Sequence, residues 1–364
     1  MHPSQADYLQ DTVEHLDPTA FDAVPLIEGM SKMSFQSRNL ARASIIFNQM
    51  VKEEGCRNFL CLAGSLVSAG LKKTIRTLID CNMIDCIVST GANMVDMDFL
   101  EALGFKHYLG DSKADDDELH KRAIDRIYDT YISEYDLRVC DATVTEVANR
   151  MPPRPTSSRE LMAALGAYLV EQDKGRDSIL RACYEKNVPV FVPSLSDCSA
   201  GFGLGLHQKQ NPGAHVSHDS VKDFTELTEL ILDAKSTGLF IIGGGVPKNF
   251  MQDTVVMADV LGHPVPMHKY AVQITVADER DGALSGSTLK EAHSWGKVEQ
   301  GAEQMVFCEA TVAMPLVVSY VYSKGEWQAR RKESLNRKFE SVYLRAVASP
   351  KKRIQKKALS SVTA

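Results

Sequence analysis

The sequence predicts an α/β fold, a Rossmann-like parallel sheet flanked by helices, with an N-terminal helical extension and a basic C-terminal tail. Six short segments are apolar at consecutive positions, which is typical of strands buried on both faces. Glycine or small polar residues end these segments, and the stretches between them are long enough for crossover helices. Hydrophobic residues make up 44% and charged residues 24% of the 364 positions, the balance of a globular protein.

The expected strands cover residues 58–65, 84–93, 188–196, 238–245, 270–278 and 304–311. A helix is predicted from Ser220 onward, because Ser220 and Asp223 form a capping-box pair before apolar residues at helical spacing. Prolines at 151–155 and around 211–213 predict loops. Since α/β units flank the first loop on both sides, we expect one core. The expected parts are an N-terminal extension (1–34), the α/β domain (35–322) and a basic C-terminal helix and tail (323–364).

Charge and hydropathy argue against several classes of protein. The net charge of −6 argues against nucleic-acid binding by the whole chain, and no apolar run reaches the roughly 20 residues of a membrane helix. The acidic N-terminus lacks the pattern of a signal peptide, so we expect a cytoplasmic protein. The eight dispersed cysteines contain no CxxC pair and predict buried free thiols. For the basic C-terminus, a solvated helix and frayed tail is favoured over an anionic docking patch.

Small residues gather where four of the expected strands end. In open α/β sheets this edge binds ligands, because loop amides and helix N-termini can meet phosphate there. Each cluster alone is weak evidence, since a lone Gly-Gly-Gly after a strand is more often just a tight turn, and no GxGxxG fingerprint follows the first strand. Four clusters in one sheet predict a Rossmann-like nucleotide site without that fingerprint. They are Ala63-Gly64-Ser65, Thr90-Gly91-Ala92-Asn93, Ser196-Asp197-Cys198-Ser199 and Gly243-Gly244-Gly245.

The stretch KEAHSWGK (290–297) contains a candidate nucleophile, Lys297. Lysine attacks a carbonyl or imine only as a neutral amine, and an apolar wall such as Trp295 favours that form. On these residues alone, an exposed surface charge is still the leading interpretation. The order of the segments leads us to expect Lys297 beside the four loops. His215 and His218 have the spacing of a metal pair but lack further ligands, so a loop or capping role is favoured and no metal is predicted.

Longer motifs in the chain resemble the deoxyhypusine synthase family, roughly from Phe35 to Leu316. The resemblance implies NAD-dependent transfer of an aminobutyl group from spermidine to an acceptor amine, through an imine on the active-site lysine. It also implies a homotetramer, a dimer of dimers, with active sites between paired subunits. The motifs are FQSRNLARA (35–43), SLVSAGLKKTIRTLI (65–79), STGAN (89–93), AIDRIYD (123–129), PSLSD (193–197), GLFIIGGGVPK (238–248), EAHSWGK (291–297) and FCEATVAMPL (307–316).

The resemblance also implies roles for single residues. Lys297 would form the imine, Trp295 would line the substrate channel, and Glu291 would hold a cationic amine. A larger set falls on positions that line the NAD site. These are Gly64, Ser65, Ser68, Thr90, Gly91, Ala92, Asp197, Gly243, Gly244, Asp281, Gly282, Ser285 and Glu309.

Four departures from the family pattern fall on substrate-binding positions. Phe202 and Leu284 replace carboxylates that grip spermidine, Asn249 replaces a histidine, and Val95-Asp96 replaces an acidic pair. Because an ammonium beside Phe202 and Leu284 would lack a partner, we expect a different donor or a different way of holding it. The donor could be a polyamine or an amine with another tail, such as a guanidinium or carboxylate. A homospermidine synthase using putrescine and a non-catalytic NAD-binding scaffold are the alternatives, and a protein acceptor stays an open question.

Overall fold

The computed structural model describes residues 4–281 and 287–339. At its centre lies a six-stranded sheet in the order β11-β10-β9-β1-β2-β7, with every pairing parallel. This confirms the predicted fold class and all six predicted strands. Each strand is shorter than its predicted segment, because the small residues at its end form a loop. The strands are β1 (Cys56–Leu62), β2 (Cys86–Ser89), β7 (Val190–Phe191), β9 (Ser236–Ile242), β10 (Tyr270–Thr275) and β11 (Glu303–Phe307).

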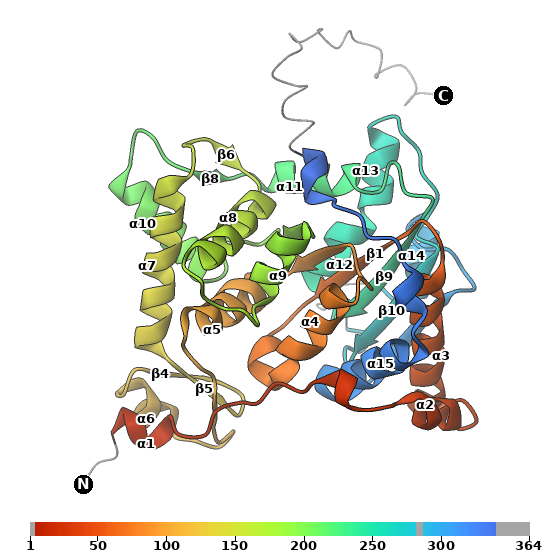
Figure 1. Cartoon of the computed structure of the whole chain (residues 1–364), viewed down its shortest axis with the longest axis horizontal. Helices are drawn as coiled ribbons and strands as arrows, with labels where there is room; N and C mark the ends of the chain where they lie inside the picture. The colour runs from red at the N-terminus through yellow and green to blue at the C-terminus, as the bar shows by residue number, and fades with distance from the viewer. Residues whose placement is uncertain (1–3, 282–286, 340–364) are drawn as a thin grey trace, which may run out of the picture.

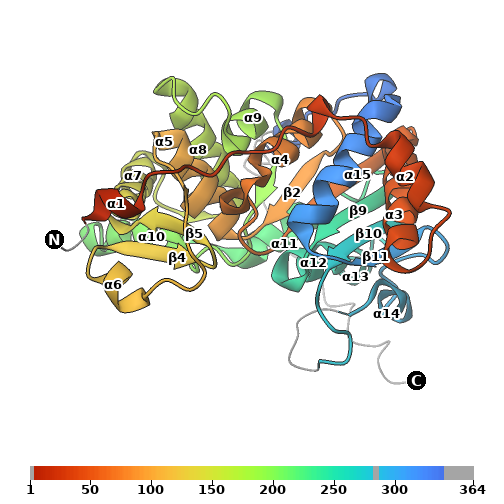
Figure 2. The same cartoon turned by 90° about the horizontal axis from the view of Figure 1, so that it is seen from below.

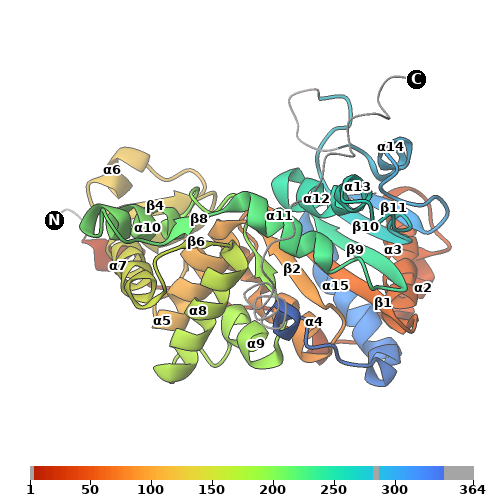
Figure 3. The same cartoon turned by 90° about the horizontal axis from the view of Figure 1, so that it is seen from above.

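Helices cover both faces of this sheet, as Figures 2 and 3 show. Side chains alternate along each strand, so Leu60 and Leu62 pack in one core and Phe59 and Cys61 in the other. One face is covered by α3 (Phe35–Lys52), α4 (Lys72–Asp80) and α15 (Ala310–Lys324). The opposite face is covered by α11 (Ser220–Glu229), α12 (Gly245–Gln252), α13 (Thr254–Val260) and α14 (Leu289–Ser294).

A further group of elements, with β4, β5, β6 and β8 among them, lies to the left of the six-stranded sheet in Figure 1. A three-stranded antiparallel sheet, β3 (Tyr108–Leu109), β5 (Thr130–Ser133) and β4 (Ile124–Ile127), was not predicted from the sequence. A short parallel pair joins β6 (Pro155–Thr156) to β8 (Ser217–His218). The other helices are α1 (Gln5–Tyr8), η1 (Pro18–Ala20), α2 (Val24–Met30), η2 (Val67–Leu71), η3 (Ala92–Phe99), α5 (Leu100–Leu103), α6 (Asp116–His120), α7 (Glu134–Arg150), α8 (Ser158–Glu171), α9 (Ile179–Lys186), α10 (Ser199–Gln210) and η4 (Glu326–Ala329).

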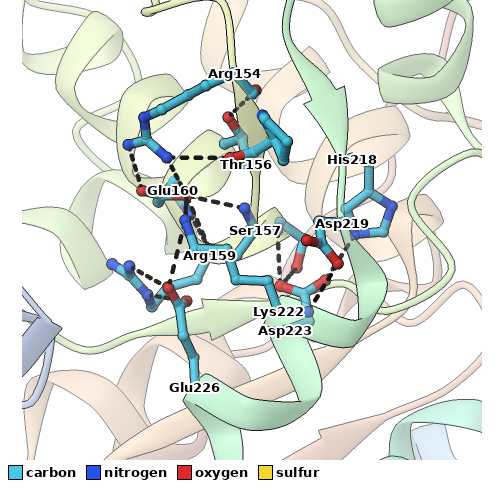
Figure 4. Close-up of polar contacts among 12 residues, drawn as sticks. Arg154, Thr156, Ser157, Arg159, Glu160, His218, Asp219, Lys222, Asp223 and Glu226 are labelled. Atoms are coloured by element: carbon cyan, nitrogen blue, oxygen red, sulfur yellow. Dashed lines mark hydrogen bonds and ion pairs between the residues drawn. The ribbon is translucent and has the colours of Figure 1, made fainter. Parts of the chain in front are cut away.

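The start of α11 corrects the predicted capping box. The capping side chain is Asp219, which accepts a hydrogen bond from the backbone N of Lys222 at 2.9 Å. Asp223 is fully buried and instead accepts from the backbone N and Oγ of Ser158, at 2.7 and 2.9 Å. Its other oxygen lies 2.7 Å from Nε2 of His218 (Figure 4). The capping box is therefore wrong, because Asp223 satisfies the first turn of a different helix, α8.

The two ends of the described chain pack against the α/β core. From the N-terminal segment, Ile27 is fully buried and His15 lies 2.8 Å from Glu101. From the C-terminal segment, Leu335 is buried and Arg330 forms an ion pair with Asp85. All eight cysteines are free thiols, seven buried and Cys308 half-buried, which confirms that prediction. Among the helices of residues 4–281 and 287–339, none has the length and apolar content to cross a membrane.

Candidate active site

The loops that follow β1 and β2 are fixed to each other at the carboxyl edge of the sheet. Thr90 Oγ1 donates to the carbonyl of Gly64 at 3.0 Å. Asn93 is fully buried; its Oδ1 accepts from the backbone N of Leu66 at 2.7 Å, and its Nδ2 donates to the carbonyl of Ala63 at 3.2 Å. Because one side chain satisfies donors and acceptors of the neighbouring loop, the two loops form a single preorganised unit.

Gly91 brings the third small-residue cluster against this unit. A Cβ atom at Gly91 would lie only 2.2 Å from Sγ of Cys198, so no larger residue fits there. Ser68 is buried and donates its hydroxyl to the carbonyl of Ser65 at 2.9 Å, so it supports the shape of its own loop. Ala92 begins η3, a π-helical segment, which is a geometry often found at functional sites.

The fourth cluster continues the same edge. The backbone N of Ala63 donates to Ile242 at 3.0 Å, and that of Gly243 donates to Ile274 at 2.8 Å. Gly244 and Gly245 then start α12, whose first-turn amides lie at this edge. Further along, Glu309 caps α15 by accepting from the backbone N of Thr311 at 2.8 Å. The loops after β7, β2, β1 and β9 thus form a continuous rim of backbone groups that suits a phosphate-bearing ligand.

Lys297 lies in a turn with well-defined backbone contacts. Gly296 has a φ of 70°, a left-handed conformation that favours glycine and ends the turn after α14. The backbone N of Lys297 donates to Ala292 at 3.0 Å, and its carbonyl accepts from the backbone N of His268 at 2.9 Å. The Lys297 Nζ lies 2.5 Å from Oδ1 of Asp253 and 5.3 Å from the ring centroid of Trp295. The lysine is therefore held between a carboxylate and an aromatic face.

In the described chain, Lys297 does not lie on the rim of small residues. His268, its backbone partner, lies two residues before β10, at the amino end of that strand. The rim follows the carboxyl ends, and the six residues of β10 span about 16 Å. The nucleophile candidate and the four loops therefore lie toward opposite ends of β10 in the described chain, although the sequence had led us to expect them side by side.

Glu291 and Trp295 occupy the ends of α14. Glu291 completes a capping box with Thr288: its Oε2 accepts from the backbone N of Thr288 at 2.7 Å, while its own backbone N donates to the threonine hydroxyl. These hydrogen bonds from Thr288 lower the pKa of Glu291, so the exposed carboxyl stays ionised. Trp295 follows the helix with 67% of its surface exposed. Both side chains are accessible to a substrate that approaches this face.

Phe202 is the fourth residue of α10 and has 61% of its surface exposed, and carboxyl groups gather at the start of this helix. Asp96 accepts from the backbone N of Ser199 at 2.7 Å. Burial raises the pKa of Asp96 to about 6, and the charges of Asp141 and Asp197 add to that rise. Asp141 is buried, with Oδ2 bonded to Arg138 at 3.0 Å and Oδ1 without a partner. An acidic group therefore lies at the start of the helix that carries Phe202, the position at which the family's carboxylate is replaced.

The other substrate and cofactor positions are partly described. Asn249 is half-buried on α12, and Asp281 is exposed at the last described residue before a gap. Gly282, Leu284 and Ser285 lie outside the described residues. His215 and His218, the pair considered for metal binding, contact the carbonyl of Asn211 and the carboxylate of Asp223.

Sequence reasoning missed Lys248, which lies in α12 and is fully buried. Its Nζ donates to Oε1 of Gln273 at 2.9 Å and to the carbonyl of Ser287. Burial lowers the pKa of Lys248 to about 8, against the opposing effect of Glu291. One signal was present in the sequence: Gln273 interrupts the apolar run YAVQITV, and a polar residue inside a buried strand needs a partner.

The fold and the site define the class of protein. It is an α/β protein with a rim of backbone groups suited to a nucleotide and, toward the other end of β10, a lysine that is a candidate nucleophile. A family model for deoxyhypusine synthase matches residues 25–321. This chain therefore belongs to the deoxyhypusine synthase family, whose members are transferases and generally depend on NAD.

Named relatives and a solved structure agree with this assignment. A deoxyhypusine synthase-like protein of Chlorobaculum parvum is 58% identical over 91% of this chain and 95% of its own length. One from Coxiella burnetii is 54% identical over 92% of this chain and 95% of its own length. The crystal structure of a protein assigned as deoxyhypusine synthase from Entamoeba histolytica aligns with a TM-score of 0.59 at 18% identity. It covers 89% of this chain and 99% of that one, and it supports the fold alone.

Proposed function

We propose that this protein is an NAD-dependent aminoalkyl transferase that moves a group between amines through an imine on Lys297. The observation that carries the proposal is the environment of Lys297, which sits 2.5 Å from Asp253 and against Trp295 in a chain of the deoxyhypusine synthase family. A nucleophilic lysine needs both a group that handles its proton and a partly apolar wall.

The rim of small residues fits the NAD that the family uses. Its loops present backbone amides and hydroxyls, Asn93 preorganises them, and Gly91 leaves no room for a side chain between the second and third clusters. NAD bound there would supply the hydride chemistry of the reaction, as the acceptor of a hydride from a carbon next to the donor nitrogen and as the source of the hydride for the final reduction. Thr90, Gly64 and the Gly243 turn would hold its phosphates, and Asp281 would hold its ribose hydroxyls.

Lys297 performs the covalent step. Its neutral amine attacks the oxidised, imine form of the donor, and the donor's second amine leaves with a proton as a free diamine. The aminoalkyl group is then joined to Lys297 through an imine. An acceptor amine displaces Lys297 in the same way, and reduction of the new imine completes the product. Asp253 is close enough to take up and return the proton of the lysine at each exchange.

Carboxylates provide the recognition of a cationic amine. Glu291 stays ionised at the start of α14, and Asp96, Asp141 and Asp197 lie near the start of α10, the helix that carries Phe202. An ammonium or guanidinium brought among them would offset their mutual repulsion. The substrates we propose are therefore a small amine or polyamine donor and an amine acceptor.

The separation of Lys297 from the rim supports assembly of the active site from two subunits. One protomer would contribute the rim with NAD, and its partner would contribute α14 with Lys297 and Trp295. The family resemblance implies a homotetramer built as a dimer of dimers, and such an assembly would supply the paired subunits.

A substrate panel tests the function. The protein is incubated with NAD and single or paired amines, including spermidine, putrescine and a guanidinium-bearing amine, and new amines are identified by mass spectrometry. We expect a product with an added aminoalkyl group. Homospermidine from putrescine alone would assign the protein as a homospermidine synthase, whereas no product with any donor would favour a non-catalytic NAD-binding scaffold.

A further inference from the structure

We propose that Lys248 is a positioning residue that joins the Gly243 turn of the cofactor rim to the helix before Lys297, through Gln273. The inference rests on the proposed function, because the two parts that it joins are the cofactor site and the nucleophile segment.

The connection is a chain of three hydrogen bonds. Gln273 donates from Nε2 to the carbonyl of Gly243 at 2.8 Å, and its Oε1 accepts from Nζ of Lys248 at 2.9 Å. The same Nζ donates to the carbonyl of Ser287, the residue before the N-cap of α14. These bonds therefore hold together the Gly243 turn after β9, the strand β10 with Gln273, and the segment at Ser287 that leads into α14.

The bridge lies between the two parts of the site. Gln273 is the fourth of six residues of β10, while the rim lies beyond the carboxyl end of that strand and His268, the partner of Lys297, precedes its amino end. Lys248 lies on α12, whose first residues belong to the rim and whose last residue is followed by Asp253, the ion-pair partner of Lys297. A shift of α12 or α14 would break one of these contacts.

Stability alone does not account for a lysine at this position. A fully buried ammonium loses its hydration, and an apolar side chain of similar volume would usually be as stable or more stable. Methionine, for example, would fill the site without a buried charge. The charged groups that act on Lys248 are Glu291 on α14 and Lys297 after α14. The ammonium therefore connects groups that the proposed reaction uses.

Two substitutions each remove a different contact of the bridge. Lys248→Met removes the contact with Ser287 and leaves the Gln273 to Gly243 bond in place. Gln273→Glu keeps an acceptor for Lys248, but an ionised carboxylate cannot donate to Gly243. Lys290→Met, at an exposed lysine of α14, is the matched control. Each variant is measured for NAD affinity by titration and for labelling of Lys297 by a four-carbon amino aldehyde with borohydride, located by peptide mass spectrometry.

Opposite patterns are expected from the two variants. Lys248→Met should lower the labelling rate of Lys297 about tenfold or more and change the NAD dissociation constant less than about threefold. Gln273→Glu should weaken NAD about tenfold and affect labelling less. Wild-type labelling in Lys248→Met, or wild-type NAD affinity in Gln273→Glu, would overturn the bridge. If Lys248→Met unfolds, the near-isosteric Gln273→Glu still decides the case.

Hydrogen exchange tests the bridge without any catalytic reaction, so its outcome is independent of the proposed function. Lys248→Met should increase hydrogen exchange of the amides in residues 287–296, whereas Lys290→Met should not. If the wild-type protein neither binds NAD nor labels at Lys297, the proposed function fails, and unchanged exchange in Lys248→Met would show that the bridge fails as well.

Discussion

The rim at the carboxyl ends of the strands differs in composition from the α12–α14 face, the surface of α12 and α14 that carries Lys297 and Asp253. The rim is made of small, mostly uncharged residues whose loops bond to each other, as Asn93 and Thr90 do. The α12–α14 face carries charged side chains, with Lys297 beside Asp253 and Lys248 buried beneath them. A dinucleotide needs close approach to backbone, whereas a lysine nucleophile needs a controlled charge environment. The two regions can therefore be tested with separate substitutions, although Lys248 and Gln273 connect them.

Removal of the nucleophile should give the largest difference between the effect on covalent labelling and the effect on NAD binding. Lys297→Ala is expected to abolish borohydride trapping of a substrate adduct. NAD binding should stay nearly intact, because the described contacts of the Lys297 side chain are with Asp253 and Trp295 and not with the rim. Lys290→Ala on the same helix is the control and should trap normally. An unchanged adduct yield in Lys297→Ala would remove Lys297 as the nucleophile.

A change in the rim should have the converse effect. Asn93→Ala leaves the buried backbone N of Leu66 without its partner, so we expect a loss of stability of about 1–3 kcal/mol. We also expect NAD to bind at least about tenfold more weakly, since the loops lose their preorganisation. Urea unfolding and NAD titration measure the two effects, with the exposed Gln210→Ala as control. NAD affinity like that of the wild type would show that Asn93 does not shape the cofactor site.

The acidic group near Phe202 predicts a pH-dependent effect on stability. The pKa of Asp96 is raised to about 6, so the native state holds this proton more tightly than the unfolded chain does. The resulting contribution is favourable at low pH and is lost as the pH rises from about 4 to about 6. Asp96→Asn should therefore be more stable than the wild type at pH 7, by about 1 to 3 kcal/mol, with little difference below pH 4. Thermal unfolding from pH 4 to 8 measures this, and equal stability at pH 7 would contradict it. Asp129→Asn, at an exposed carboxyl, is the control.

Restoring the family's carboxylate should give the smallest effect. Phe202→Asp is expected to lower KM for spermidine a few-fold, about the effect of one charge-assisted hydrogen bond in an exposed setting, while NAD affinity stays unchanged. Phe202→Asn, which is polar but uncharged, separates charge from loss of the ring. If both variants lower KM equally, the carboxylate is not the cause.

The comparison of the two regions also explains how far sequence reasoning reached. The rim was predicted because small residues end apolar segments, a local pattern that the structure confirms at the ends of β1, β2 and β9. The partners within it were not predicted: Asn93 contacts residues about 30 positions away, and nothing local marks its side chain as buried. The capping box at Ser220 shows the same limit, since Asp223 is used by Ser158, 65 positions away.

The sequence by itself determined the six strands, their parallel arrangement and the family, because buried strands and long motifs are encoded in consecutive residues. Only the tertiary structure decided that Lys297 pairs with His268 at the amino end of β10, that Asp253 is its ionic partner, and that Lys248 and Gln273 lie between it and the rim. The physical reason is that burial follows from local periodicity. The partner of a buried or charged side chain, by contrast, depends on which distant segments the folded sheet brings together.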